Sequence, residues 1–128
     1  MKAQLAVLLL LGVCAGPAVL AQSNLGEFKD APSGKFTPED FTMLWSAVDA
    51  VSITRKVGTS KTWENAATGN GGAIKLLNVF TTAEGRDCRR LKVDNHAKKL
   101  KGSSKQIVCA GPDGKWMVDS DARPAPKP

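Results

Sequence analysis

Hydrophobic and polar residues alternate with a helical period in the segment before about residue 58. The apolar positions recur at three- and four-residue spacing, which is typical of one face of an amphipathic helix. They are Phe41, Leu44, Trp45, Val48 and Val51. The stripe predicts a helix that packs into the protein core, and we interpret it as core rather than as a binding groove.

The residues around this stripe predict where the helix begins and ends. Thr37 is suited to the N-cap, and Pro38 is suited to the first helical position. Glu39 and Asp40 place negative charge in the first turn, so we interpret them as helix-start acids and not as a general acid and base. Gly58 is expected to stop the helix.

Beyond residue 60 the helical period disappears, and glycine-rich or proline-containing turns separate short β-rich runs. Successive strands joined by short turns favour an antiparallel sheet, and one helix against that sheet gives a two-layer α+β domain. We expect four to five strands and one disulfide. The expected strands are residues 61–65, 73–82, 86–94, 103–110 and 115–118.

The N-terminus has the pattern of an export signal. Lys2 precedes an apolar run at residues 5–13, and small residues come before a predicted cleavage site after Ala21. The apolar run is too short for a membrane anchor, and Pro17 follows it closely. Val13 before Cys14 departs from the small residue of a lipoprotein signal, so we do not expect lipidation.

Removal of residues 1–21 leaves two cysteines, Cys88 and Cys109, and a net charge of +5. In an oxidising compartment an even pair of cysteines predicts one disulfide. The polar residues 22–35 are expected to form a leader before a domain at residues 36–118. The proline-rich residues 119–128 are expected to form a loose tail.

Positive charge is concentrated in residues 86–115, which carry nine basic and three acidic side chains. The cluster favours an anionic partner, such as lipopolysaccharide phosphate, teichoic acid or an acidic protein, although a merely solvated hairpin is the alternative. Nucleic acid is not favoured, because aromatic side chains that could stack on bases are absent except for Trp116. The candidate anion-binding residues are Arg86, Arg89, Arg90, Lys92, Lys98, Lys99, Lys101 and Lys105.

Catalytic and metal-binding patterns are weak in this sequence. His96 is the single histidine and lies among lysines in an expected loop. The sequence contains no nucleophile-elbow motif for which His96 could act as the base. The cysteines are assigned to each other, which leaves too few ligands for zinc. We therefore expect no catalytic residues, no metal and no cofactor.

Several short motifs occur in a fixed order along the chain. With Cys88 and Cys109, their residues are Trp63, Asn65, Gly69, Gly72, Gly85, Asp113, Gly114 and Trp116. This order and spacing resembles the C-terminal domain of the bacterial 17 kDa outer-membrane surface antigen family. The resemblance covers residues 41–118 and implies an envelope protein without a known catalytic site. Many members carry a lipobox and a glycine-zipper segment, and this sequence is expected to lack both, which favours a soluble periplasmic form.

Three functions are compatible with these features. The first is a non-enzymatic, exported envelope domain, periplasmic or associated with the outer membrane, that binds an anionic envelope component or an envelope protein. The second is a small secreted hydrolase or nuclease that uses His96. The third is a periplasmic inhibitor of an envelope enzyme, which its positive charge would restrict to an acidic target.

Overall fold

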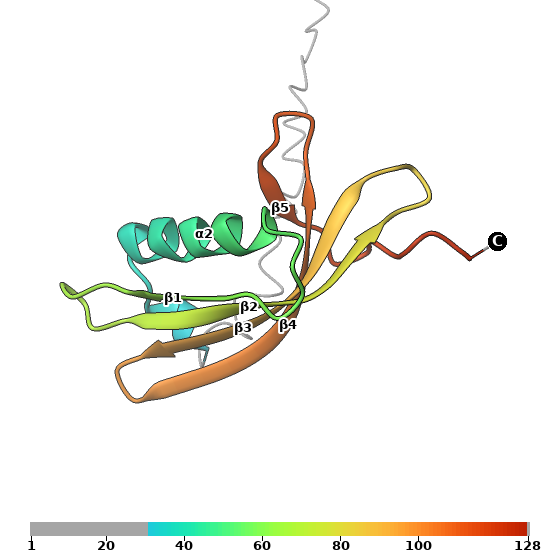
Figure 1. Cartoon of the computed structure of the whole chain (residues 1–128). Coiled ribbons are helices and arrows are strands. Elements are labelled where there is room, and N and C mark those ends of the chain that lie inside the picture. Colours follow the sequence, from blue (N-terminus) through green and yellow to red (C-terminus); the bar gives the residue numbers. More distant parts are fainter. Residues whose placement is uncertain (1–30, 128) are drawn as a thin grey trace, which may run out of the picture.

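The structure is a computed structural model that describes residues 31–127. A short 3-10 helix, η2 (Pro32–Lys35), precedes helix α2 (Pro38–Ser52). Five strands follow and form one antiparallel sheet in chain order (Figure 1). They are β1 (Ser60–Glu64), β2 (Gly71–Thr81), β3 (Asp87–Ala97), β4 (Leu100–Ala110) and β5 (Trp116–Val118). The expected signal peptide with Cys14, and residues 22–30 of the leader, lie outside the described residues.

Helix α2 begins as the sequence predicts and ends earlier. The Thr37 hydroxyl accepts from the Asp40 backbone N–H, and the Asp40 carboxylate accepts from the Thr37 backbone N–H, which completes a capping box. The helix stops at Ser52, and Arg55 already has a left-handed φ of 54°. The prediction that Gly58 ends the helix is wrong, because Gly58 turns the chain later, at the entry to β1.

The α+β fold with a five-stranded sheet is confirmed, but β3 and β4 are longer than expected. They join through Lys98 and Lys99 alone, with Lys98 at a left-handed φ of 55°. This tight connection extends both strands toward the turn. His96 therefore lies in β3, and its expected place in a loop is corrected.

The core lies between α2 and one face of the sheet, here called the inner face. Val48 and Val51 of the helix pack with Trp63, Ile74 and Leu76. The helix runs over β1 and β2, and the β4–β5 hairpin rises on the same side (Figure 1). Helix α2 therefore covers only part of the inner face.

Both ends of the domain pack against the sheet beyond the expected boundaries. Pro32 of η2 is buried, and lies against Gly102 of β4. At the other end Ala122 is buried over the Cys88–Cys109 disulfide. The Ala125 backbone N–H donates to the Thr81 carbonyl at 2.9 Å. Residues 119–125 are therefore a strap along the sheet, which corrects the expectation of a loose tail.

Candidate functional site

The face of the sheet opposite α2, here called the outer face, carries a row of three lysines. Lys92 of β3 lies directly opposite Lys75 of β2 and directly opposite Lys105 of β4. Their side chains point to one face, because residues paired across antiparallel strands share a side of the sheet. All three residues are exposed. We call Lys75, Lys92 and Lys105 the lysine row.

The lysine row has little compensating negative charge. Asp94 pairs with Lys92 at 3.7 Å, and both side chains are about half exposed. Among the described residues Lys75 and Lys105 have no ion pair. Like charges directly opposite in a sheet are destabilising, so the row opposes folding slightly.

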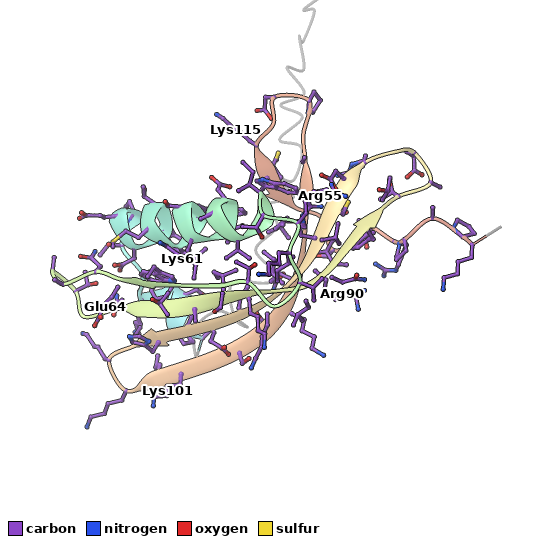
Figure 2. The ribbon with its side chains drawn as sticks, in the orientation of Figure 1. Arg55, Lys61, Glu64, Arg90, Lys101 and Lys115 are labelled. Carbon is purple, nitrogen blue, oxygen red and sulfur yellow. A yellow bond between two sulfur atoms is a disulfide. The ribbon has the colours of Figure 1, made fainter. Side chains whose placement is uncertain are left out.

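The other expected basic residues divide between the outer face and the hairpin tip. Arg90 is half-buried on the outer face, next to the row, and its buried Nε has no partner. Lys98 and Lys99 form the β3–β4 turn, and Lys101 follows them on β4. Figure 2 shows Lys101 at this turn, whereas Lys115 lies on the separate β4–β5 hairpin. Arg90 and the hairpin-tip lysines therefore lie at different positions along β3, β4 and their connecting turn.

Arg86 and Arg89 do not belong to this surface. Arg86 donates from Nη1 to Asp119 Oδ2 of the C-terminal strap. Arg89 is 1% exposed, so its assignment to an anion-binding cluster is corrected. Its position on the inner face of β3, opposite Val79 and Val108, accounts for the burial.

The buried Arg89 guanidinium of β3 connects three elements of the fold, α2, β3 and β5. Its Nε donates to the Ser52 carbonyl at the end of α2 at 2.8 Å, and Nη2 donates to Asp87 Oδ2 at 3.0 Å. Its Cζ lies 4.7 Å from the ring centroid of Trp116, a cation–π contact. The hydrogen bonds from Arg89 hold the pKa of the Asp87 carboxyl below its ordinary value, and Arg55 adds to this effect. Arg89 is therefore a structural residue.

The most enclosed polar cluster surrounds Asp40. The Asn65 amide and the Thr68 hydroxyl each donate to Asp40 Oδ1 at 2.8 Å, and the Asn70 amide donates to Oδ2 at 2.8 Å. Burial raises the pKa of this carboxyl, but the bonds from Thr37, Asn70, Thr68 and Asn65 outweigh burial and hold the pKa far below its ordinary value. The β1–β2 turn therefore clamps the start of α2.

The motif glycines do not all act alike. Gly69, Gly85 and Gly114 have positive φ in turns, as the sequence predicts. Gly72 lies within β2, where a Cβ would come within 2.1 Å of the Asp94 carbonyl oxygen. Glycine is therefore needed there because β2 and β3 approach closely, and not because of a turn. In the last hairpin Asp113 accepts from the Lys115 N–H next to Gly114.

His96 is half-buried on β3, paired with Gly71 and Lys101. The hydrogen bonds of residues 31–127 do not include its imidazole. Within the same range no three His, Cys, Asp or Glu side chains gather in a way that could hold a metal ion.

An apolar groove of about 410 Å³ opens on the inner face beside α2. Phe41, Leu44 and Trp45 line its helix wall, and Leu91 and Val93 lie on its floor. Phe41 remains 39% exposed. The apolar stripe of α2 is therefore buried at Val48 and Val51, and Leu44 and Trp45 pack against the core while they line the groove. Only Phe41 departs from the expectation that the stripe is core.

Sequence reasoning missed two of these features. Lys75 lies outside the basic segment, and only the pairing of β2 with β3 places it beside Lys92. The available signal was the alternation of apolar and polar residues over 73–82. It shows which neighbours share a face with Lys75 only when the pairing register of the strands is known. Asp40 was interpreted as a helix-start acid, and its burial depends on a turn about 25 residues away.

The comparisons with known proteins agree with this description. The family model of the 17 kDa outer membrane surface antigen matches residues 50–117, which is more than half of the chain. Neither the curated proteins nor the solved structures contain a significant match. In residues 31–127 no helix is long and apolar enough to cross a membrane. The chain belongs to the 17 kDa outer membrane surface antigen family, a family of the cell envelope.

Proposed function

We propose that this protein is a non-enzymatic binding or structural component of the cell envelope, exported to the periplasm or the outer membrane, and that its lysine row holds an anionic envelope component. The family places the chain in the envelope. The single observation that supports the anionic partner is the direct alignment of Lys75, Lys92 and Lys105 across three strands.

The spacing of the lysine row favours a ligand with several negative charges. Neighbouring strands lie about 4.8 Å apart, so three aligned lysines span roughly 10 Å. A single carboxylate cannot neutralise all three ammonium groups, whereas a chain of phosphates or a phosphorylated glycan can contact each of them. Arg90 and the hairpin-tip residues Lys98, Lys99 and Lys101 would extend the contact along the same side of the sheet. Lipopolysaccharide phosphate and teichoic acid both have this chemistry.

The test compares two variants with the same change in net charge. In the first, Lys75, Lys92 and Lys105 are all replaced by Gln; in the matched control, Lys35, Lys56 and Lys61 are replaced instead. All six residues are exposed, and the control residues lie outside the row. Co-sedimentation with lipopolysaccharide is measured from low to high salt, because exposed charge interactions are screened by ions.

We expect the row variant to bind at least about tenfold more weakly, with a flatter dependence on salt. The control variant should bind nearly as well as the unmodified protein. Equal losses in the two variants would show that net charge alone governs binding, and would contradict the lysine row as a site. A second variant, with Lys98, Lys99 and Lys101 replaced by Gln, measures the contribution of the hairpin tip.

A further inference from the structure

Strand β4 has a long free edge in the described part of the protein. β5 pairs only with Val108, Cys109 and Ala110. No strand of residues 31–127 pairs with the remainder of β4 on that side, residues 100–107. Residues 101–105 are correspondingly exposed. An unpaired edge presents a row of backbone donors and acceptors that a further strand can complete.

The hydrogen bonds identify which backbone groups face this edge. The Asp119 N–H donates to the Ile107 carbonyl at 2.9 Å, so Ile107 directs its backbone away from β3. In an antiparallel sheet this direction alternates along a strand. The N–H and carbonyl groups of Lys101, Ser103 and Lys105 therefore also point outward, at three evenly spaced positions.

The apolar groove lies immediately inside this edge. Its lining includes Gly102, Ser104 and Gln106, the β4 residues that alternate with the outward-directed ones. Pro32 of η2 lines one part and Val118 of β5 another, while α2 forms the long wall. Pro32 packs over Gly102, so the groove reaches the edge beside Ser104 and Gln106. An occupant that reaches the groove across this edge would lie beside β4.

We propose that the β4 edge accepts an extended protein segment as an added strand, whose side chains alternate between apolar residues, which enter the groove, and acidic residues, which face the outer side of the sheet. Residues opposite Gly102, Ser104 and Gln106 would project against Phe41, Leu44 and Trp45. Residues opposite Lys101, Ser103 and Lys105 would project to the outer face, where the lysines lie. The six residues of β4 from Lys101 to Gln106 would pair along roughly 20 Å, because the outward Ile107 carbonyl already accepts from the Asp119 N–H.

The charge of the edge argues for an acidic partner and against a second copy of this chain. Lys101 and Lys105 are both exposed on the outer side, and Lys92 is the neighbour of Lys105 on β3. Lysines on an edge strand oppose pairing with a similarly charged edge. A strand with Glu or Asp at alternate positions converts the same lysines into cross-strand pairs of opposite charge.

This inference shares Lys101 and Lys105 with the proposed function, but its strand pairing depends on backbone groups and the groove, which the lysine row does not use. The central variant is Ser103→Pro, which removes one outward N–H without changing charge. Proline is tolerated on an edge strand where the N–H faces solvent. Ser103→Ala is the matched control, since it removes the same hydroxyl and keeps the N–H.

The probe is a synthetic seven-residue peptide that alternates Val or Leu with Glu, labelled for fluorescence anisotropy, and titrated with the exported form of the protein. We expect saturable binding that Ser103→Pro weakens about tenfold and Ser103→Ala leaves unchanged. Replacement of Lys101 and Lys105 by Gln should weaken it as well. A peptide with the same composition in scrambled order, and one with Lys in place of Glu, should bind poorly.

Four results would overturn the inference. Equal binding of the alternating and scrambled peptides would exclude a pleated strand, and equal binding by Ser103→Pro and Ser103→Ala would exclude pairing through the edge backbone. No binding would exclude an acidic strand altogether. A dimer in sedimentation that Ser103→Pro dissociates would assign the edge to a second copy. Lipopolysaccharide binding should be unaffected by Ser103→Pro, so failure here is distinguishable from failure of the lysine row.

Discussion

Asp40 illustrates how a single buried carboxylate can organise two elements. It completes the capping box of α2 and accepts three side-chain hydrogen bonds from the β1–β2 turn. A buried charge that keeps its partners is tolerated, whereas removal of one member of such a network leaves polar groups without partners. The motif residue Asn65, together with Thr68 and Asn70, therefore stabilises the start of the helix.

We predict that Asp40→Asn lowers the free energy of unfolding by roughly 3 kcal/mol at pH 7, because an amide cannot accept all of these bonds. Urea denaturation measures the change, and Glu39→Gln, at the exposed neighbouring residue, is the control. A loss below about 0.5 kcal/mol, the range of an ordinary surface substitution, would contradict the network.

The same residue gives a pH dependence with a definite sign. The pKa of Asp40 is held far below its ordinary value in the folded protein, whereas an unfolded Asp titrates near pH ~3.9. Its contribution is therefore complete above about pH 5, and it is lost as the pH falls below the unfolded pKa. The stability difference between the protein and Asp40→Asn should shrink from pH 5 toward pH 2, and a constant difference would contradict this origin.

At the scale of elements, the sequence predicted the helix and the order of the strands because each has a strong local signal. The helical period of α2, the alternating periods of the strands, and the turns at Gly69, Gly85 and Gly114 depend only on nearby residues. Local patterns do not determine where the helix lies across the sheet. The stripe of α2 shows which side is buried, but not that the helix lies over β1 and β2 and leaves a groove beside β4.

The pairing register of the strands accounts for the remaining differences between the expected and the observed positions of the basic residues. Arg89 and Lys92 are three positions apart in a basic run, yet they point to opposite faces of β3, so one is buried and the other exposed. Charge density along the chain cannot separate them. A pairing of Lys75 with Lys92 likewise requires the register of β2 on β3, which depends on the whole sheet and includes a bulge near Asn78.

The disulfide between β3 and β4 should contribute to the thermal stability of the sheet. Cys88 and Cys109 are directly opposite on β3 and β4, and both are buried. Loss of the cross-link should cost about 3 kcal/mol through the entropy of the unfolded chain. Reduction should therefore lower the melting temperature by more than about 10 °C. Thermal unfolding followed by circular dichroism, with and without reductant, measures this shift.

The double variant Cys88→Ala and Cys109→Ala is the control for the reductant itself. It should melt near the reduced protein, and reductant should not change its melting temperature. Indistinguishable melting curves for the oxidised and reduced protein would contradict a stabilising role of the bridge.

At the scale of the whole molecule, the two faces of the sheet have different characters. The inner face is apolar and carries the groove, whereas the outer face carries the lysine row. Figure 1 shows α2 lying along the inner side of the sheet. The C-terminal strap covers the disulfide end of the outer face and leaves the lysine row open. This division separates the lysine row from the groove, although Lys105 belongs both to the row and to the β4 edge.

The strap provides the last prediction. Ala122 is 6% exposed and packs on the disulfide with Phe80 and Ile107. The Arg86–Asp119 ion pair is partly exposed, so its contribution to stability is small. The hydrogen bond from Arg86 nevertheless lowers the pKa of Asp119. The strap should therefore act mainly by excluding solvent and reductant from the bridge.

Two truncations separate this shielding from a general loss of stability. A chain that ends after Ala122 loses the bond from Ala125 to Thr81 but keeps the cover, whereas one that ends after Val118 loses the cover too. We predict that dithiothreitol reduces the disulfide several-fold faster in the shorter chain, and at a nearly unchanged rate in the longer one, because thiol–disulfide exchange requires access to a sulfur. Free thiols titrated over time at a temperature well below both melting transitions measure the rates. Equal rates in the two truncations would mean that the strands alone bury the bridge, and that the strap serves another part of the outer face.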